Sequence, residues 1–539
     1  MTSTDLYDGI MVGAGHNSLV CAAYLARAGQ RILVVEAGPR IGGGTTTQEA
    51  TLEGYQHNLH AFFVRWTPDY TIWDDLELDR HGVASIWPEV QNAVPFDEGD
   101  RALVTYRSLA KSLESIADLS PEDAEAYARL HEEYQTLIEA IEVPLRFAPP
   151  MPPDEQDDLL RQSRIGRRYL AIQDRSPLEL VSGAFEHEAL RSLVLFNVAV
   201  RGYLPNLDVA GLGSIVPLAL VNSHDGRLIS GGTGQVAAAI AASAMAHGAD
   251  VITGTPVSAV DVEHGRAVGV TLEDGRRFGA RRFVASGVPA PMTMLDLVGA
   301  NHLDSGQRDE LESYRWLEEA LFGLHWALSD RPRFKAEKNN PDVPAALNLA
   351  LGYESSTDLV EHMMALRLDS DVGSGPSHVS IPTVHDPAQA PPGGHTTFAW
   401  HFVPGQTRRG SWDDAAVAER TRAIVDTYLK YAPNLEDVTE AVAVHSPDDT
   451  EEQNASMRGG DRHHGSYHPT NWGYNRPTAR MPGYRTPVEG LYLCGASQHP
   501  GGSFTGQPGY NAAGVIATDL DIDAWWAPHE VGDVLLDLV

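Results

Sequence analysis

A glycine-rich turn near the N-terminus constrains the fold of this chain more than any other feature. Residues 7–12 form a short apolar run, GAGHNS (13–18) follows it, and LVCAAYLARAG (19–29) places apolar residues at helical spacing up to Gly29. A second apolar run, 31–35, ends at Glu36. A strand, a glycine turn, a helix, a strand and an acid within about thirty residues predict a βαβ dinucleotide-binding unit.

The residues of this turn have separate physical roles. Gly13 lets the strand turn sharply, and Gly15 lets main-chain amides approach a pyrophosphate without an intervening Cβ atom. The start of the helix, with His16 and Asn17, offers free N–H groups and the positive end of the helix dipole to that anion. Ser18 replaces the usual third glycine, and it is small enough for close packing of the helix against the strand.

The segment that follows the second strand helps to choose between nucleotides. Glu36 can accept hydrogen bonds from a ribose diol and would repel a 2′-phosphate, so an NADP-type nucleotide is disfavoured. NAD and FAD share the βαβ unit, but AGPRIGGGTTT (37–47) resembles the second glycine motif of the flavoproteins that include amine oxidases and phytoene desaturases. We therefore expect FAD, bound non-covalently, with contributions from this segment by Ala37, Arg40, Gly43, Gly44 and Thr45.

The rest of the chain alternates between helical and strand-like patterns. Residues 108–199 are helical in pattern around a proline-rich loop at 149–153, and GGTG (231–234) precedes a predicted helix. A strand near Val251 leads into VSAVDVEHGRAVGVTLEDG, whose alternation and HG and DG turns predict a β-hairpin or meander. Strands of a mixed sheet are predicted for ALFGLHWAL, ALNLALGY, SHVSIPTV, TTFAWHFV and VTEAVAV, ordered loops for 446–487, a strand for GLYLCGA and a helix for 511–519.

The length and charge of the chain restrict its partners. A chain of 539 residues is too long for one hydrophobic core, so two or more domains are expected. With 40 basic and 73 acidic residues, the net charge is −33, which disfavours binding to nucleic acid or to anionic lipid through a basic patch. Neither a signal segment nor a transmembrane run is visible, and Cys21 and Cys494 suit small buried residues in a reducing compartment, so we expect a cytoplasmic protein.

Four motifs in three separated regions of the chain together resemble one family. YRTPVEGLYLCGASQHPGGSFTGQPGYNAAG (484–514) is similar to the closing motif of the phytoene desaturase-like FAD oxidoreductases, in the branch that includes carotenoid ketolase-type and pyridine nucleotide-disulfide oxidoreductase domain-containing proteins. GAGHNSLVCAAYLARAG resembles the N-terminal motif of that branch, residues 231–260 its central motif, and RGGDRHHG with the later NRP (475–477) its pre-terminal loop.

The resemblance implies an α/β fold with a glutathione-reductase-like FAD-binding Rossmann domain and an inserted α+β substrate domain of mixed sheet and helices. The FAD domain would comprise 1–75, 220–300 and 480–525, and the substrate domain 76–219 and 301–479. Val257 would meet the adenine end of FAD, and His499 and Pro500 would lie beside the isoalloxazine. The flavin and ribityl end would be lined by Gly495, Gly502, Thr505, Gly506 and Asn511.

Several histidines are candidates for catalysis. Where members of the family often have F-D-x-G-x, this chain has HNLHAFF, so we expect His57, Asn58 and His60 to face the flavin, which counts against a purely apolar, carotenoid-like substrate. His60, His57 and His499 are the candidate bases, because the ordinary pKa of histidine is near working pH, with a structural or flavin-positioning role as the alternative for each. The group of His463, His464 and His468 favours a loop over a metal site, and no metal is expected.

The leading hypothesis is an FAD-dependent dehydrogenase or desaturase that removes hydride from a hydrophobic isoprenoid, carotenoid-like or aromatic molecule. GLGSIVP (211–217) has a proline where a dinucleotide helix would continue, so no second nucleotide domain is expected, and dioxygen or a quinone would reoxidise the flavin. Two alternatives are an FAD-dependent alcohol or amine oxidase and a prenyl-binding escort of the GDP-dissociation-inhibitor type. The sequence leaves the oligomeric state open, a homo-oligomer included.

Overall fold

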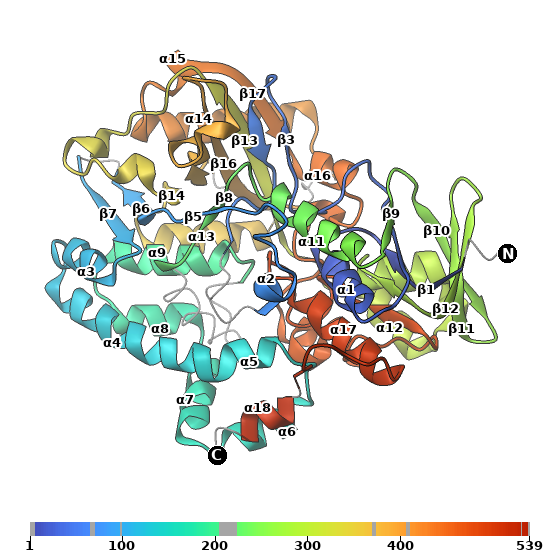
Figure 1. The fold of residues 1–539 in the computed structure, drawn as a ribbon. Helices are drawn as coiled ribbons and strands as arrows, with labels where there is room; N and C mark the ends of the chain where they lie inside the picture. Colours follow the sequence, from blue (N-terminus) through green and yellow to red (C-terminus); the bar gives the residue numbers. More distant parts are fainter. Residues whose placement is uncertain are drawn as a thin grey trace.

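Two large β-sheets organise the molecule (Figure 1). The structure is a computed structural model that describes residues 6–64, 71–96, 100–203, 224–368, 373–405, 410–529 and 531–536. The GLGSIVP segment lies outside the described residues. Figure 1 shows the sheet that contains β1 on the same side of the molecule as α1, α11 and α17. The part of the other sheet that contains β6, β7 and β14 lies on the opposite side, near α3 and α9.

The first sheet contains the predicted βαβ unit. Its strand order is β10-β11-β12-β1-β2-β9, with β18 paired to β12. Pairing is parallel from β12 through β1 and β2 to β9 and between β12 and β18, while β10 and β11 add an antiparallel hairpin. The strands are β1 (Leu6–Val12), β2 (Ile32–Val35), β9 (Asp250–Ile252), β10 (Val257–Glu263), β11 (Arg266–Leu272), β12 (Arg277–Ser286) and β18 (Leu491–Leu493).

Three helices from distant parts of the chain pack together beside this sheet. They are α1 (His16–Arg27), α11 (Gly234–Ala246) and α17 (Gln507–Asp519). All three contribute side chains to one buried core, in which alanines are frequent and allow the helices to approach closely. The expected helix 511–519 begins four residues earlier, at Gln507, because Pro508 occupies the first turn, where its missing N–H is tolerated.

The second sheet is mixed and contains all five predicted strands. Its order is β17-β13-β16-β15-β14-β6-β7, and only β14 and β6 pair in parallel. The strands are β13 (Glu319–Leu328), β14 (Asn348–Leu351), β15 (Ser377–Ser380), β16 (His395–Pro404) and β17 (Thr439–His445), joined by β6 (Val90–Pro95) and β7 (Ala102–Tyr106), which were not predicted from the sequence. Two small sheets pair β3 (Thr47–Glu49) with β4 (Gln56–Asn58) and β5 (Ser85–Ile86) with β8 (Leu228–Ile229).

The predicted helical region over 108–199 is present. Several of its helices begin after a serine whose side chain accepts a hydrogen bond from the third amide of the helix, and these caps are Ser108, Ser120, Ser163 and Ser176. The helices are α3 (Leu109–Ala117), α4 (Pro121–Leu137), α5 (Val143–Arg146), α6 (Pro153–Leu160), α7 (Arg164–Gln173), α8 (Pro177–Ala184) and α9 (Glu188–Ala199).

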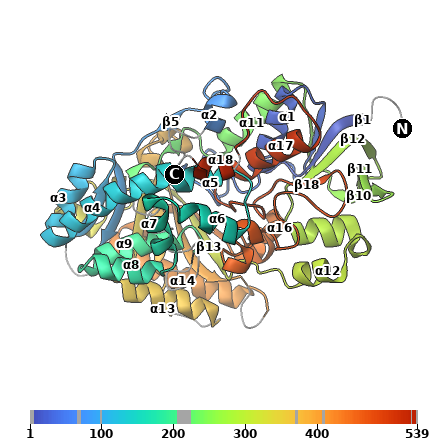
Figure 2. The same cartoon turned by 90° about the horizontal axis from the view of Figure 1, so that it is seen from below.

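The remaining helices surround these layers. They are α2 (Thr71–Asp75), α12 (Ser305–Glu312), α13 (Ser356–Arg367), α14 (Asp414–Tyr431), α15 (Leu435–Val438), α16 (Pro447–Gln453) and α18 (Val531–Leu536). The C-terminal helix α18 lies against α5 and α6 (Figure 2). Helix α16 lies in a region expected to be loop, and it forms because Ser446 and Asp449 make a capping box around Pro447 at the first helical position.

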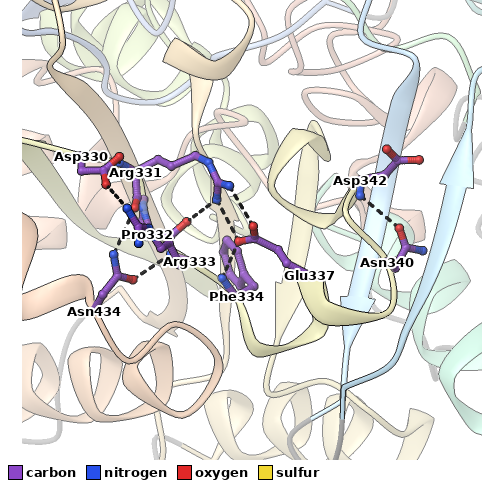
Figure 3. A network of polar contacts seen from close by, with 9 residues as sticks. All are labelled: Asp330, Arg331, Pro332, Arg333, Phe334, Glu337, Asn340, Asp342 and Asn434. Atoms are coloured by element: carbon purple, nitrogen blue, oxygen red, sulfur yellow. Dashed lines mark hydrogen bonds and ion pairs between the residues drawn. The ribbon is translucent and has the colours of Figure 1, made fainter.

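A polar network fixes the connection that leaves β13 (Figure 3). Arg331 donates two hydrogen bonds of 2.8 Å to the Glu337 carboxylate, whose Oε1 also accepts one from the Phe334 amide. Asn434 receives a 2.7 Å bond from the Arg333 amide and donates to the Arg331 carbonyl. Because Asn434 precedes α15 and β17, these bonds tie the two strands β13 and β17 together beyond their ends.

The two cysteines lie far apart in sequence but are neighbours in space. Both are buried and free, Cys21 on α1 and Cys494 directly after β18. Burial, followed by the interaction with Cys494, raises the pKa of the Cys21 thiol well above its ordinary value, and the Cys494 thiol donates to the Ser18 hydroxyl at 3.7 Å. The expectation of small buried residues is confirmed.

Candidate functional site

The predicted glycine turn forms an open cradle at the start of α1. Gly15 is the N-cap of the helix, with φ −64° and ψ 156°, and a Cβ atom built on it would meet no atom within 4 Å. Gly13 has φ +88°, a conformation that L side chains rarely adopt. The first turn of α1 therefore faces open space with its amide groups, as a site for an anion requires.

The second glycine segment packs against this cradle through main-chain atoms. The Gly42 amide donates a 2.8 Å hydrogen bond to the Ala14 carbonyl, and Gly15 and Gly42 form an isolated parallel bridge. Gly43 has φ +60°, and a Cβ atom on it would lie 3.3 Å from the Gly15 Cα. Glycines at these positions allow two loops to approach as closely as strands do.

The C-terminal motif meets the same helix. A Cβ atom on Gly509 would lie 2.0 Å from the Asn17 carbonyl oxygen, so α17 can contact α1 only because this residue is glycine. Ser18 is buried, and its hydroxyl fills the space beside Gly287, where a Cβ atom would approach it to 1.9 Å. Segments around residues 15, 43 and 509 thus converge on one point of the fold.

Glu36 lies at the end of β2 with its carboxylate directed to this region. Its Oε2 accepts a 2.7 Å hydrogen bond from the Ala14 amide, and its Oε1 accepts a 2.8 Å bond from the Gly38 amide. Each carboxylate oxygen retains a further lone pair, so the group can still accept from a hydroxyl of a ligand.

A cavity of about 930 Å³ extends from the cradle to the second sheet. Sixteen of the residues predicted from the sequence line it, fifteen as cofactor residues and one as a base: Gly13, Gly15, His16, Asn17, Ser18, Glu36, Ala37, Arg40, Gly43, Gly44, Thr45, Val257, Gly495, Gly502, Thr505 and His60. Five others do not line it: His57, His499, Pro500, Gly506 and Asn511.

Some of the predicted residues that do not line the cavity instead form hydrogen bonds between the segments around it. Asn58, expected to face the flavin, instead receives hydrogen bonds from the Thr233 amide (3.0 Å) and the Thr47 hydroxyl (2.8 Å). It thereby joins the β3–β4 hairpin to the GGTG turn, which does not line the cavity either. Asn511 donates to the Arg146 carbonyl and to the Tyr484 hydroxyl, so its amide joins α17 to the end of α5.

The candidate bases are not alike in position, but all three have a depressed pKa. Only His60 lines the cavity, while the His57 ring bonds to the Thr51 hydroxyl at 2.8 Å and the His499 ring to the Leu145 carbonyl at 3.0 Å. Burial is the largest cause that lowers the pKa of each of the three to about 4. The expectation of a pKa near working pH is therefore wrong, and His60 is a neutral imidazole at pH 7.

The far end of the cavity is apolar, and sequence reasoning missed most of its residues. Phe62 contacts Phe63, Phe398 and Trp400 edge to face, with ring centroids 4.6, 4.8 and 5.5 Å apart. The lining there includes Phe62, Phe63, Val200, Tyr203, Leu321, Trp400 and Phe402. These residues come from several distant parts of the chain, and the only signal available was the alternation of the strands β13 and β16.

Several buried polar atoms around the cradle have no hydrogen-bond partner in the structure. They include His16 Nε2, Asn17 Oδ1, Thr505 Oγ1, and both amide atoms of Gln507, all on residues that line the cavity. Unpaired buried groups of this kind are costly unless a ligand or water completes them. A large polar ligand fits this end, and an apolar one fits the other.

Two further histidines, His463 and His464, line the cavity, whereas His468 does not. Among the residues that the structure describes, no group of three or more His, Cys, Asp or Glu side chains is arranged to hold a metal ion. None of the described helices combines the length and apolar character needed to cross a membrane.

The arrangement matches a known class of enzymes. Residues 19–513 match the model of the flavin containing amine oxidoreductase family, so the chain belongs to that family and is a flavin-dependent oxidoreductase. The resemblance found in the sequence and the expected fold class are confirmed, with the mixed second sheet beside the Rossmann-type sheet.

Relatives cover nearly the whole chain. A limonene dehydrogenase polypeptide of Castellaniella defragrans is 31% identical over 98% of both chains. Pyridine nucleotide-disulfide oxidoreductase domain-containing protein 2 of Mus musculus is 28% identical, covering 95% of this chain and 94% of its own. A lycopene-forming phytoene desaturase of a Paracoccus species is 25% identical, covering 95% and 97%. A solved oxidoreductase structure from Methanosarcina mazei shares the fold, with a TM-score of 0.59 at 16% identity over 95% of this chain and 99% of its own.

Proposed function

We propose that the protein binds FAD non-covalently in the cavity and removes hydride from a hydrophobic small molecule, as a dehydrogenase or desaturase. The observation that carries this proposal is the continuity of the cavity: a glycine cradle with unpaired polar atoms at one end and an aromatic wall at the other share one space. A bound FAD supplies the flavin ring that accepts hydride from a C–H bond.

The cradle residues divide the binding of FAD among them. The free amides at the start of α1 favour the pyrophosphate, and Gly15 and Gly43 keep this approach clear of side chains. Glu36 accepts hydrogen bonds from the ribose, and Val257 borders the adenine end. By this proposal the parts 1–75, 220–300 and 480–525 form the FAD domain, and 76–219 with 301–479 form the substrate domain.

The apolar end holds the substrate and excludes water from the reacting C–H bond. Phe62, Phe63, Trp400 and Phe402 offer a wall that binds a carbon skeleton by burial of apolar area. The relatives named for limonene and phytoene support a substrate of this kind. His60 borders the same space as a neutral imidazole, so it can orient a polar group but is a weak base at pH 7.

An oxidase that acts on an alcohol or amine is the second candidate, and membership of the flavin containing amine oxidoreductase family supports it. Membership of an enzyme family removes the reason for the escort hypothesis. The two enzyme candidates differ in the substrate and in the speed with which dioxygen reoxidises the reduced protein.

Anaerobic titration of the purified yellow protein tests both. Terpenes, alcohols and amines are added in turn while the visible flavin absorbance is recorded, and air is then admitted. Bleaching by a hydrophobic terpene or aromatic compound, with slow return of colour until a quinone is added, is expected. Bleaching by amines alone with immediate recolouring would favour the oxidase, and a protein that is colourless and does not take up FAD would refute the proposal.

A further inference from the structure

An arginine lies at the apolar end of the cavity, where a hydrocarbon substrate would give it no partner. Arg462 lines the cavity with a side chain that is only 10% exposed. Its Nη1 donates to the Glu319 main-chain carbonyl at 3.4 Å, and its Cζ lies 5.8 Å from the centroid of the Phe402 ring. The guanidinium is thus held between the main chain and an aromatic wall.

Glu319 forms an ion pair with this cation but does not complete its hydrogen bonds. Nη2 of Arg462 is 3.7 Å from Oε1 of Glu319, beyond hydrogen-bond reach, and both atoms are buried without a hydrogen-bond partner. Asp461 is no substitute, because its oxygens accept from the amides of Leu317 (2.9 Å), His463 (2.8 Å) and Gly465 (2.7 Å). Nη2 of Arg462 therefore lacks a hydrogen-bond acceptor in a buried setting.

Protonation of Glu319 leaves the charge of Arg462 only partly compensated at neutral pH, with Asp461 as the other nearby carboxyl group. Burial raises the pKa of Glu319 to about 8, with Asp461 and Glu318 adding to the rise and Arg462 opposing it. Burial also lowers the pKa of His60 to about 4 and that of His378 to about 3, so both rings are neutral. With a pKa of about 8, Glu319 is largely protonated at pH 7 and compensates Arg462 only in part; Arg146 and Arg201 also line the cavity.

We propose that Arg462 binds a carboxylate on the substrate, so that the natural substrate is an apolar acid: an isoprenoid, alicyclic or aromatic skeleton that carries one carboxylate. This inference rests on the proposed function and narrows its substrate class. A carboxylate would complete the unpaired Nη2 and neutralise a buried cation, while the carbon skeleton lies against the aromatic wall. Charge-assisted hydrogen bonds formed away from water are among the stronger ones that proteins make.

Calorimetric titration of the FAD-loaded protein tests this with three matched series. Each series holds the skeleton constant and changes one group: limonene, perillyl alcohol and perillate; myrcene, geraniol and geranate; toluene, benzyl alcohol and benzoate. In at least one series the acid is expected to bind about tenfold to a hundredfold more tightly than its neutral partners. If the neutral compounds bind as well as the acid in every series, or if no acid binds, the inference is overturned.

Variants separate Arg462 from general charge effects. Arg462→Met is expected to remove the preference for the acid, and Arg462→Lys to retain part of it, because an ammonium keeps the charge but loses the planar fork. Arg458→Met removes an exposed arginine from the same segment and should leave the preference unchanged. Equal losses in Arg458→Met and Arg462→Met would show that only the overall charge matters and would contradict the proposal.

The pH dependence gives an independent readout. Because Glu319 ionises as the pH rises through about 8, it then competes with the ligand for Arg462, and the affinity for the acid should fall between pH 7 and 9. Glu319→Gln should flatten this fall. The visible spectrum of the same samples reports bound flavin, so failure of the proposed function (no flavin) is distinct from failure of this inference (flavin bound, no preference for acids).

Discussion

The two ends of the cavity differ in the atoms that form their walls. At the cradle, the contacts are between main-chain atoms: Gly42 donates to Ala14, a Cβ atom on Gly43 would be in tight contact with Gly15, and Gly509 approaches α1 more closely than a side chain would allow. At the apolar end, large side chains from the second sheet and its surroundings, such as Phe62 and Trp400, form the wall. The first end depends on the absence of side chains and the second on their shape, so substitutions at the two ends should affect different properties.

The largest expected effect is at the cradle. In Gly15→Val, the new side chain would enter open space, because a Cβ atom meets nothing within 4 Å and the backbone at φ −64° accepts any residue. We expect the unfolding free energy to change by less than about 1 kcal/mol. Bound flavin per chain should fall more than tenfold, because the valine occupies the place of the pyrophosphate.

Absorbance of the released flavin and urea unfolding measure the two quantities on one preparation. Gly183→Val is the matched control, since Gly183 is exposed on α8 and the nearest atom to its Cβ is 3.9 Å away. Retention of flavin in Gly15→Val would mean that the cofactor does not pass over this turn. It would contradict the assignment of FAD binding to the cradle and of stability to the apolar end.

The opposite pattern is expected at the apolar end. Trp400 is 5% exposed and stacks on Phe398 with a centroid distance of 4.1 Å. Trp400→Ala should lower the unfolding free energy by about 3–5 kcal/mol through loss of burial and creation of a cavity. Flavin content should stay within about twofold of the parent in the fraction that remains folded, since the cradle is built from other residues.

Chemical denaturation of the FAD-loaded protein provides the measurement, with Trp87→Ala as the control. Trp87 is 39% exposed, so its loss should cost about 1 kcal/mol or less. If Trp400→Ala lost flavin as completely as Gly15→Val, the two ends would be one cooperative unit rather than two.

The difference between the cradle and the apolar end also explains how much of the molecule could be predicted from the sequence. The βαβ unit, the hairpin of β10 and β11 and the five strands β13 to β17 follow from periodicity and glycine turns, and each was found within a few residues of its expected place. The cradle was predictable for the same reason, because Gly13, Gly15 and Glu36 lie close together in the sequence. Helix α16 was missed although Ser446, Pro447 and Asp449 carry its capping signal.

The apolar end offered no such local signal. Phe62, Val200 and Trp400 come to line one cavity only through the packing of segments that are far apart in the sequence, and none has a distinctive sequence context. The histidines show a second limit of prediction from the sequence, which concerns the pKa of a side chain. His57 and His60 were both expected to face the flavin, but only His60 of the two lines the cavity, and the burial that lowers the pKa of both to about 4 depends on the tertiary structure.

A smaller effect is expected from Glu36, a charged side chain at the cradle. Glu36→Gln keeps a single acceptor where the carboxylate has two, and both oxygens are already bonded to the amides of Ala14 and Gly38. We expect the affinity for FAD to fall about tenfold, as for loss of a hydrogen bond to a charged group. Quenching of flavin fluorescence on titration into the flavin-free protein measures it.

Glu49→Gln is the control for this change. Glu49 also accepts a hydrogen bond from a main-chain amide, that of Gly54 at 3.0 Å, but it lies on β3 and does not line the cavity. An unchanged affinity in Glu36→Gln would assign the carboxylate a purely structural role in the turn and place the ribose elsewhere.

The smallest effect is expected at the third position of the glycine motif, where this chain has Ser18. The hydroxyl fills the space beside Gly287 and Cys494, which indicates packing as its role. Ser18→Gly should lower the unfolding free energy by about 0.5–1 kcal/mol, because glycine in a helix costs more backbone entropy, and should leave the affinity for FAD within about twofold. Ser18→Val should destabilise more than Ser18→Gly, since the added atoms have no room against Gly287. A Ser18→Gly protein that is fully stable but has lost flavin would show that the Ser18 hydroxyl binds the cofactor. Main-chain contacts alone would then not account for FAD binding at the cradle.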